Sequence, residues 1–363
     1  MMSIFEDKRV VMTLDAGGTS FRFHAMQGGK QVTETIKNLI DGDDLQGCLD
    51  AIFEGFEKTR ERCPEPPVAI SFAFPAPADY PAGIIGDLYN IPGFRGGVPL
   101  GPMLEAKFGI PVFINNDGDL FAYGEAIAGF LPKLNRELEE NGNPRRFHNL
   151  FGVTFGTGFG GGIVRRGQLH VGDNSMAGEI WCTMNAVDPD SNAEEGVSIR
   201  AVKREYARLA GISFDESPDP YDIELIAFGK KEGDAEAAKE SYRLLGRVAG
   251  AAMAQAMTLI DGVAVIGGGL SAAYPLFMPS LIETMGGKHK GSGNPRLPSK
   301  PFDLTDPAGH AEFIKDHSKA IDVPGTDKKL IYDPLQRLGV GISVLGTSEA
   351  ITTGAYAFAL SNI

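Results

Sequence analysis

Two glycine clusters beside hydroxyl side chains stand where phosphate groups could bind. One follows the apolar run Val10–Leu14 and reads Asp15-Ala-Gly-Gly-Thr19, and the other follows Leu150–Phe155 and reads Gly156-Thr-Gly-Phe-Gly-Gly-Gly162. Glycines at a turn let backbone N–H groups approach phosphate oxygens, and Thr157 would add a hydroxyl donor. Either cluster could also form a tight hairpin that binds nothing. Two clusters in equivalent positions of two similar halves favour phosphate binding.

The second cluster also matches, at Gly156, Gly158 and Gly161, the G-x-G-x-x-G spacing of dinucleotide-binding folds. That motif requires a helix directly after it. Here Ile163–Val171 alternates about a turn at Gly167 and predicts a hairpin instead. The sequence also contains no G-x-x-x-x-G-K-[ST], which disfavours a P-loop. A hairpin whose glycines face phosphate is therefore the preferred interpretation.

Two aspartates at predicted strand ends could carry the chemistry of phosphoryl transfer. Asp15 could hold Mg²⁺ through water, because Mg²⁺ keeps most of its hydration shell and needs few protein ligands. Asp117 follows the predicted strand Val112–Asn115 and could take a proton from a hydroxyl that attacks a phosphoryl group. The alternative is structural: Asp15 could stabilise its own turn, and Asp117 could cap the following helix.

Strand and helix signals alternate along the chain and must position these residues. The pattern predicts strands over residues 10–14, 20–26, 31–36, 68–74, 112–115, 150–155, 163–166 and 168–171, helices over 45–63, 118–129 and 235–259, and a final apolar run over 263–266. The segment 286–327, rich in Pro, Gly and Lys, has little periodicity and predicts an irregular excursion over the surface. Pro132 and the polar run 135–146 indicate a boundary near residues 130–148.

We therefore expect an α/β protein with two domains and a cleft between them. The N-terminal domain would span residues 1–130 and be completed by a helix over 346–363, and the C-terminal domain would span 131–345 with an irregular insertion at about 286–327.

Composition excludes several other classes of protein. The 363 residues carry 34 Lys and Arg against 47 Asp and Glu, a net charge of −13, which disfavours nucleic-acid binding. The three cysteines have no paired spacing, which fits a reducing cytoplasm and supports neither disulfides nor a cysteine-based zinc site. No leader pattern or long apolar run predicts secretion or a membrane span. The 47 glycines exceed the usual proportion of about 7% and call for a positional explanation.

Taken in order, the motifs resemble those of ROK-family sugar kinases (repressor, open reading frame, kinase). They are Asp15-Ala-Gly-Gly-Thr19, Asn90-Ile-Pro-Gly-Phe94, Ile114-Asn-Asn-Asp117 with Glu125, Phe155-Gly-Thr-Gly-Phe-Gly-Gly-Gly162, Ala177-Gly-Glu-Ile180 and Ile266-Gly-Gly-Gly269. The resemblance covers about residues 10–358. It implies the actin-like ATPase fold, in which two RNase-H-like domains close on ATP, Mg²⁺ and a hexose. It also implies a cytoplasmic homodimer.

The resemblance implies a role for each motif. Asp117 would be the catalytic base, Asp15, Gly17, Gly18 and Thr19 would face Mg²⁺ and phosphate, Gly156, Thr157 and Gly158 would form the second phosphate loop, and Gly267, Gly268 and Gly269 would line the adenosine site. Asn90, Asn116, Asp117 and Glu179 would hydrogen-bond the sugar, because each sugar hydroxyl needs a fixed partner.

The sequence departs from the family pattern after Glu179. Cys182 stands where the family commonly has a histidine that contacts the sugar, and no cysteine-rich zinc motif follows. Glu194 best matches a later glutamate that contacts the sugar, although the adjacent Glu195 leaves the register open. The six histidines have no metal-ligand spacing, so structural zinc is not expected. These departures affect the identity of the sugar more than the reaction.

The resulting hypothesis is an ATP- and Mg²⁺-dependent kinase that phosphorylates a hexose or hexosamine, at the 6-hydroxyl in the case of a hexose. The alternative is a catalytically weak sugar-binding pseudokinase or regulator. Repressors of the family carry an additional N-terminal helix-turn-helix, whereas the first strand here starts by Val10. Alanine at Gly156 or Gly268 is expected to weaken nucleotide binding before it weakens folding, with the remaining glycines in ordinary turns and the late insertion.

Overall fold

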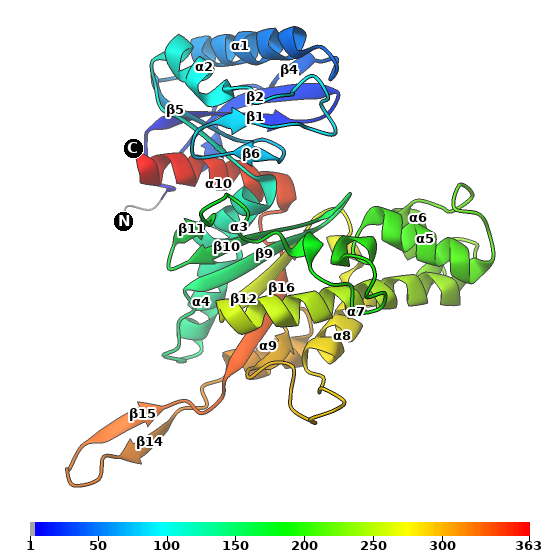
Figure 1. Ribbon diagram of the computed structural model, residues 1–363. Coiled ribbons are helices and arrows are strands. Elements are labelled where there is room, and N and C mark those ends of the chain that lie inside the picture. Colours follow the sequence, from blue (N-terminus) through cyan, green and yellow to red (C-terminus); the bar gives the residue numbers. More distant parts are fainter. Residues whose placement is uncertain (1–3) are drawn as a thin grey trace. The chain divides into compact units, whose positions relative to one another are not determined.

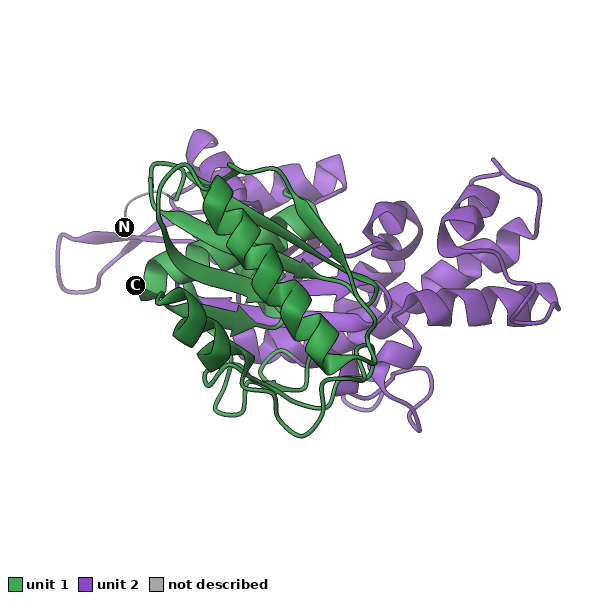
Figure 2. Ribbon diagram, turned by 90° about the horizontal axis from the view of Figure 1, so that it is seen from above, with its two compact units in different colours: residues 1–128, 168–178, 345–363 green, residues 129–167, 179–344 purple. Residues whose placement is uncertain are grey.

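The computed structural model describes residues 4–363, which divide into two compact α/β units (Figures 1 and 2). Unit 1 contains the chain up to Ala128 together with residues 168–178 and 345–363, and unit 2 contains residues 129–167 and 179–344. Within residues 4–363, no helix is both long and apolar enough to cross a membrane.

Unit 1 is built on a mixed sheet. Its strands are β1 (Val10–Ala16), β2 (Ser20–Gln27), β3 (Lys30–Gln31), β4 (Ile36–Leu39), β5 (Pro67–Ala73) and β8 (Val112–Asn115), with the short strands β6 (Ala78–Asp79), β7 (Ile84–Ile85) and β11 (Gln168–His170) outside it. The order across the sheet is β3-β2-β1-β5-β8, and β4 also pairs with β2. Because β1, β5 and β8 are parallel, their carboxyl ends lie at one edge of the sheet.

Helices cover both faces of this sheet. They are α1 (Leu45–Arg62), α2 (Leu100–Phe108), α3 (Asp117–Ile127) and α10 (Thr347–Asn362). Alternate residues of β1 point to opposite faces, as the period of a strand requires. Met12 packs in the core with Phe56 of α1, whereas Val11 packs with Tyr356 of α10. The continuous apolar run in β1 therefore reflects burial on both sides.

Glycines let α10 pack against α3 at very short range. A Cβ atom at Gly124 would lie 2.0 Å from the Ala350 carbonyl oxygen, and one at Gly354 would lie 2.0 Å from the Leu120 carbonyl oxygen. Only glycine fits where the two backbones approach this closely. Both glycines stand inside helices, so the expectation that the remaining glycines occupy turns and the late insertion is wrong here.

Unit 2 contains a second sheet with a larger helical layer. Its strands run in the order β10 (Phe159–Arg165), β9 (Asn149–Phe155), β12 (Val263–Gly267), β16 (Arg337–Ile342) and β13 (Lys300–Asp303). Its helices are α4 (Phe130–Glu140), α5 (Ile199–Ala210), α6 (Pro220–Ala227), α7 (Ala235–Ile260), α8 (Tyr274–Met285) and α9 (Pro307–Ile314), with 3₁₀ turns η1 (Ile180–Cys182), η2 (Ala193–Glu195) and η3 (Ser271–Ala273). Strands β9, β12 and β16 are parallel, so their carboxyl ends also share one edge.

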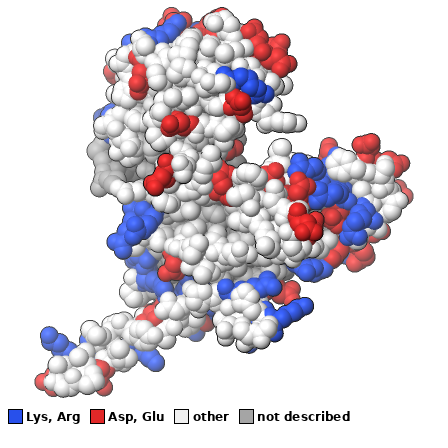
Figure 3. Space-filling model, in the orientation of Figure 1, with Lys and Arg blue, Asp and Glu red and all other residues white. Residues whose placement is uncertain are grey.

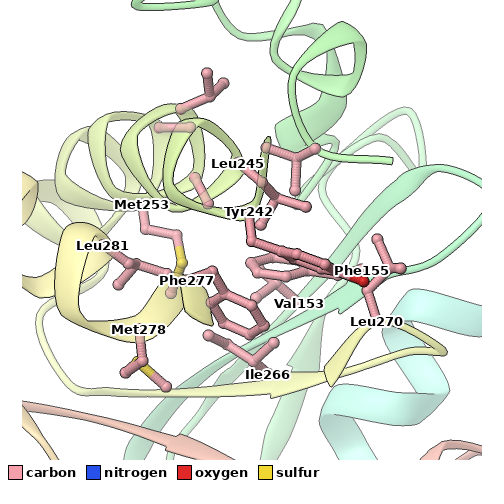
Figure 4. Close-up of a cluster of buried hydrophobic side chains, with 14 of the residues drawn as sticks. Val153, Phe155, Tyr242, Leu245, Met253, Ile266, Leu270, Phe277, Met278 and Leu281 are labelled. Carbon is pink, nitrogen blue, oxygen red and sulfur yellow. The ribbon is translucent and has the colours of Figure 1, made fainter. Parts of the chain in front are cut away.

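The core of unit 2 lies between this sheet and helices α7 and α8. Figure 4 shows Phe155 and Ile266 from the strands facing Tyr242 and Met253 from α7 and Phe277 from α8. The two helices approach each other through small residues of α7, since Cβ atoms at its Gly246 and Gly250 would lie 2.3 and 2.5 Å from carbonyl oxygens of α8. Close helix packing by glycine therefore occurs in both units.

Four stretches differ from the sequence predictions. The strand predicted over residues 31–36 does not form as one element, because only β3 (Lys30–Gln31) and β4 (Ile36–Leu39) are strands there. The polar stretch 130–148 contains helix α4, and β10 begins at Phe159, so Gly160–Gly162 lie in a strand and not in the turn. The segment 286–327 contains β13, α9 and β14 (Lys319–Asp322), which pairs with β15 (Lys329–Tyr332).

The elements of the segment 286–327 were difficult to predict because they are short and bury little. In β13 only Phe302 is buried, and every residue of β14 and β15 is exposed, so no apolar periodicity marks them. Helix α9 does carry a sequence signal: Pro307 occupies its first turn, and the Asp306 carboxylate accepts a hydrogen bond from Gly309 N–H at 2.7 Å.

We predict that Gly124→Ala destabilises the protein. A Cβ 2.0 Å from a backbone oxygen must push α10 and α3 apart. Overpacking costs about 1–3 kcal/mol, which exceeds the roughly 1 kcal/mol that alanine gains over glycine in a helix. Thermal unfolding should show a lower midpoint. The control is Gly291→Ala, because no atom lies within 4 Å of the position that a Cβ at Gly291 would take; equal midpoints for the two variants would contradict the prediction.

Candidate active site

In unit 1, the Asp15–Thr19 segment forms a tight turn at the carboxyl end of β1. Gly17 N–H donates to the Ser20 carbonyl at 3.1 Å, which closes the turn between β1 and β2. The Asp15 side chain is exposed and pairs with Arg22 at 3.3 Å. A Cβ atom at Gly18 would lie 3.6 Å from the Asn90 carbonyl oxygen, so the turn and the Asn90 loop are neighbours. Thr19 and Asn90 are exposed at this edge.

Asp117 lies at the same edge, at the first position of α3. Asn116 is the residue that caps this helix, with its Oδ1 accepting from Gly118 N–H at 2.8 Å, so the capping alternative considered for Asp117 is wrong. Asn116 Nδ2 reaches the Tyr80 hydroxyl at 3.4 Å. Asp117 Oδ1 accepts from Gly118 N–H at 2.8 Å. The carboxylate is therefore held from one side, while the side chain stays exposed to solvent.

The electrostatic environment raises the pKa of the Asp117 carboxyl. Asp117 reaches solvent yet is closely surrounded by protein atoms, and desolvation by them disfavours the charged form and is the largest influence on the pKa. Hydrogen bonds from the backbone N–H groups of Gly118 and of Asp117 itself oppose it. A carboxylate with a raised pKa is a stronger base than an ordinary aspartate. It suits a role in which a proton is accepted near neutral pH.

In unit 2, the turn Gly156–Gly158 joins β9 to β10 at the carboxyl edge of the sheet. Gly156 N–H donates to the Gly158 carbonyl at 3.0 Å, and the Gly156 carbonyl accepts from Ile199 N–H, at the start of α5, at 2.8 Å. No atom lies within 4 Å of the position that a Gly156 Cβ would take, and Thr157 is exposed. The turn therefore presents an open backbone surface.

The segment Gly267–Gly269 lies directly beside that turn. Leu270 N–H donates to the Phe155 carbonyl at 2.9 Å. Gly268 has φ +90°, and its Cβ would lie 2.3 Å from the same carbonyl oxygen. Gly268 is thus required by the backbone packing, and the expectation that alanine there weakens nucleotide binding before folding is wrong. Gly269 has open space around its Cβ position.

Glu194 contacts the Gly156–Gly158 turn. Its Oε2 accepts from Phe159 N–H at 3.1 Å, and a Cβ on Gly158 would lie 2.5 Å from the same oxygen. Glu195 pairs with Arg200 at 2.5 Å, against 4.0 Å for Glu194, and with Arg204 at 2.7 Å. The hydrogen bonds from Arg204 and Arg200 lower the pKa of the Glu195 carboxyl. Of the two glutamates that the sequence could not separate, Glu194 is the one at the glycine turn.

Glu179 and Cys182 belong to a single 3₁₀ turn. Cys182 Sγ lies 3.0 Å from the Glu179 carbonyl oxygen, and the Glu179 carboxylate accepts a hydrogen bond from the Trp181 indole. The Thr183 carbonyl accepts from Ala193 N–H at 2.7 Å, which ties this turn to the one that carries Glu194. Trp181 was not among the predicted site residues, although it is the only tryptophan of the chain and adjoins two of them.

The residues present fit Mg²⁺ and a nucleotide. The exposed carboxylate of Asp15 offers the oxygen ligand that Mg²⁺ prefers. The open backbone at Gly156 and Gly269 would admit a ligand where a side chain would otherwise stand. No group of three or more His, Cys, Asp or Glu side chains able to hold a metal ion occurs in residues 4–363.

Two α/β units with glycine turns at the carboxyl ends of parallel strands define the actin-like ATPase class, as predicted. The ROK family model matches residues 11–289. The chain belongs to the ROK family, which confirms the resemblance seen in the sequence.

Relatives and solved structures agree with this assignment. A crystal structure described as glucokinase from Parabacteroides distasonis is 49% identical, covers 100% of both chains and has a TM-score of 0.93. A glucokinase from Streptomyces coelicolor is 30% identical over 191 residues, 48% of this chain and 56% of that protein, so the match spans little more than half of that relative. An N-acetyl-D-glucosamine kinase from Vibrio cholerae is 28% identical over 271 residues, 71% of this chain and 83% of that protein.

The packing of the segment Gly267–Gly269 predicts different effects of alanine at Gly268 and at Gly269 on thermal stability. Gly268→Ala should lower the thermal midpoint, because a Cβ there meets the Phe155 backbone and the φ of +90° strains any L side chain. Gly269→Ala and Gly156→Ala should leave the midpoint within about 1 °C, a shift worth under 0.5 kcal/mol. Differential scanning calorimetry of the three variants measures this, and an unchanged midpoint for Gly268→Ala would refute it.

Proposed function

We propose that the protein is an ATP-dependent sugar kinase in which Asp117 is the catalytic base. The observation that carries the proposal is an accessible carboxylate with a raised pKa at the carboxyl end of β8, oriented by Gly118 N–H. A carboxylate in this position can accept the proton of a substrate hydroxyl. The names of the relatives, glucokinase and N-acetyl-D-glucosamine kinase, support a hexose or hexosamine as that substrate.

The two carboxylate oxygens of Asp117 would have different roles. Oδ1 holds the Gly118 N–H and fixes the side chain, and Oδ2 would accept the proton of the sugar hydroxyl. As that proton leaves, the hydroxyl oxygen forms a bond to the γ-phosphorus of ATP, and the bond from this phosphorus to the oxygen bridging to the β-phosphate breaks. The products are a sugar phosphate, for a hexose the 6-phosphate, and ADP.

The glycine turns would hold the phosphates and the adenosine. Backbone N–H groups of Gly18 and Thr19 in unit 1 and of Thr157 and Gly158 in unit 2 would donate to phosphate oxygens. Gly17 and Gly156, whose N–H groups close the two turns, would let the phosphates approach the backbone. Gly267, Gly268 and Gly269 would adjoin the adenosine. Asp15 would hold Mg²⁺ through water. When bound, Mg²⁺ neutralises charge that develops on the phosphoryl oxygens.

Polar side chains in both units would select the sugar. We assign the hydroxyl contacts to Asn90, Asn116, Asp117, Glu179, Cys182 and Glu194. Asn116 Oδ1 accepts from Gly118 N–H and one N–H of its amide donates to the Tyr80 hydroxyl, so the other amide N–H would serve the sugar. Cys182 is exposed and adjoins Glu179, as a replacement for the family histidine would require. The homodimer and the cytoplasmic location remain predictions.

Asp117→Asn should abolish phosphoryl transfer while sugar binding is largely kept, because the amide cannot accept the proton. General-base catalysis contributes about 10²–10⁴-fold, so kcat should fall by that amount. A coupled assay of ADP release, screened over hexoses and N-acetylhexosamines with ATP and Mg²⁺, measures it. Asp50→Asn is the matched control, since Asp50 is an exposed carboxylate of α1 that pairs only with Gln46 among residues 4–363.

Full activity of Asp117→Asn would contradict the assignment of the base. Absence of ADP release by the wild-type protein across the whole sugar panel would instead favour the sugar-binding pseudokinase or regulator. Sugar binding by Asp117→Asn, followed through the fluorescence of Trp181, separates loss of catalysis from loss of fold.

The pH dependence of kcat/KM should report the raised pKa of Asp117. The base works only when deprotonated, so kcat/KM should fall about tenfold per pH unit below that pKa and level off above it. The midpoint of this acid limb should lie above about 4, the ordinary aspartate value. Initial rates between pH 4.5 and 8 measure it. An acid limb that persists unchanged in Asp117→Asn would show that another group titrates.

A further inference from the structure

A basic pocket opens at the amino-terminal edge of the sheet of unit 2. Its volume is about 180 Å³, and its wall includes four arginines, Arg145, Arg146, Arg166 and Arg337, together with Asn149 and Asp261. In a chain with a net charge of −13, four arginines around one small cavity are unexpected. Figure 3 shows that both Lys and Arg and Asp and Glu are spread over the face in view.

The basic pocket lies away from the glycine turns of unit 2. Asn149 is the first residue of β9 and Arg337 the first residue of β16, and Gly262 in the pocket wall directly precedes β12. These three positions mark the amino ends of parallel strands. The turn Gly156–Gly158 and the segment Gly267–Gly269 follow the carboxyl ends of β9 and β12, at the opposite edge of the same sheet. A ligand here would therefore not occupy the candidate nucleotide site.

Arg337 contributes a buried donor that lacks a partner. The residue is only 2% exposed, and its terminal nitrogens donate to the Phe313 carbonyl at 2.6 Å, to the Lys315 carbonyl at 3.0 Å and to the Asp333 carboxylate. Its Nε has no hydrogen-bond partner in residues 4–363. A buried donor without an acceptor destabilises the folded protein, and more so when it is charged. An anion in the basic pocket would supply the acceptor.

Positive charge in the basic pocket exceeds its compensation. Arg145 and Arg337 share one carboxylate, that of Asp333, with Arg145 at 3.5 Å. Arg146 pairs with Glu139 at 3.5 Å. Arg166 is exposed and makes no ion pair within the part of the chain that the structure describes. Even with Asp261 counted against them, the arginines leave a positive excess that an anion would neutralise.

Asn149 contributes a buried acceptor without a partner in the described part of the chain, in contrast to the arginine donors. Its Nδ2 donates to the Asp261 carbonyl at 2.9 Å and lies 3.4 Å from the Ile260 carbonyl, which fixes the orientation of the amide. The Oδ1 on the other side is buried and receives no hydrogen bond in residues 4–363. A fully ionised anion cannot donate to this oxygen, whereas a hydroxyl group can.

We propose that the basic pocket binds a small phosphate monoester that carries a hydroxyl group. The arginines come from three separate segments, and the tetrahedral oxygens of a phosphate reach donors in several directions, which a planar carboxylate does not. The ester hydroxyl donates to Asn149 Oδ1. A cavity of about 150 Å³ accommodates a molecule the size of benzene, so 180 Å³ suits a three-carbon ester and is too small for a nucleotide.

Isothermal titration of the full-length protein with glycerol 3-phosphate tests this proposal, with ionic strength held constant by chloride. One saturable site is expected, with weaker binding of inorganic phosphate, which lacks the carbon-borne hydroxyl. Arg166→Gln should weaken binding of glycerol 3-phosphate about five- to tenfold, and Arg166→Lys should restore part of it. Arg146→Gln provides a second variant on a different segment.

The matched control is Arg165→Gln, because Arg165 is the exposed neighbour of Arg166 on the same hairpin and does not line the basic pocket. Its affinity should equal that of the wild type. Three results would overturn the proposal: no saturable binding, equal loss in the Arg165 and Arg166 variants, or binding of glycerate as tight as that of glycerol 3-phosphate, which would assign the pocket to carboxylates.

Discussion

The close contact between α3 and α10 fixes the position of the candidate catalytic base. Asp117 stands at the first turn of α3, and α3 is held against α10 by backbones that meet at Gly124 and Gly354. Buried Glu125 adds a second link, since its carboxylate accepts from Leu345 N–H at 3.0 Å, just before α10. The direction of one carboxylate therefore depends on a helix that follows it by more than 200 residues in the sequence.

In unit 2, glycines also bring two helices into close contact, and there the contact supports the strands that carry the glycine segments. Gly246 and Gly250 bring α7 against α8 above the sheet, and the aromatic core beneath them supports β9 and β12, from which the two glycine segments emerge. The excess of glycine thus has two physical origins. Some glycines leave open space where a side chain would stand, as at Gly156, and others allow two pieces of backbone to touch, as at Gly268.

Much of this arrangement was predictable because it depends on local patterns. Buried parallel strands are apolar throughout, so β1, β5 and β9 and the helix that begins at Asp117 could be placed within a few residues. The β14–β15 hairpin has no buried face and therefore no pattern to detect. The packing role of Gly268 and the gathering of arginines around Arg337 arise from residues far apart in sequence, which one sequence does not bring together.

The return of the chain to unit 1 has a consequence for biosynthesis. Val11 and Ala69 face α10, which belongs to residues 345–363. A ribosome that adds about 5–20 residues per second needs on the order of 10 s or more to make the intervening segment. During that interval one apolar face of the first sheet lacks its cover, while unit 2 becomes complete. The nascent N-terminal half therefore exposes apolar strand surface until residues 345–363 have been made.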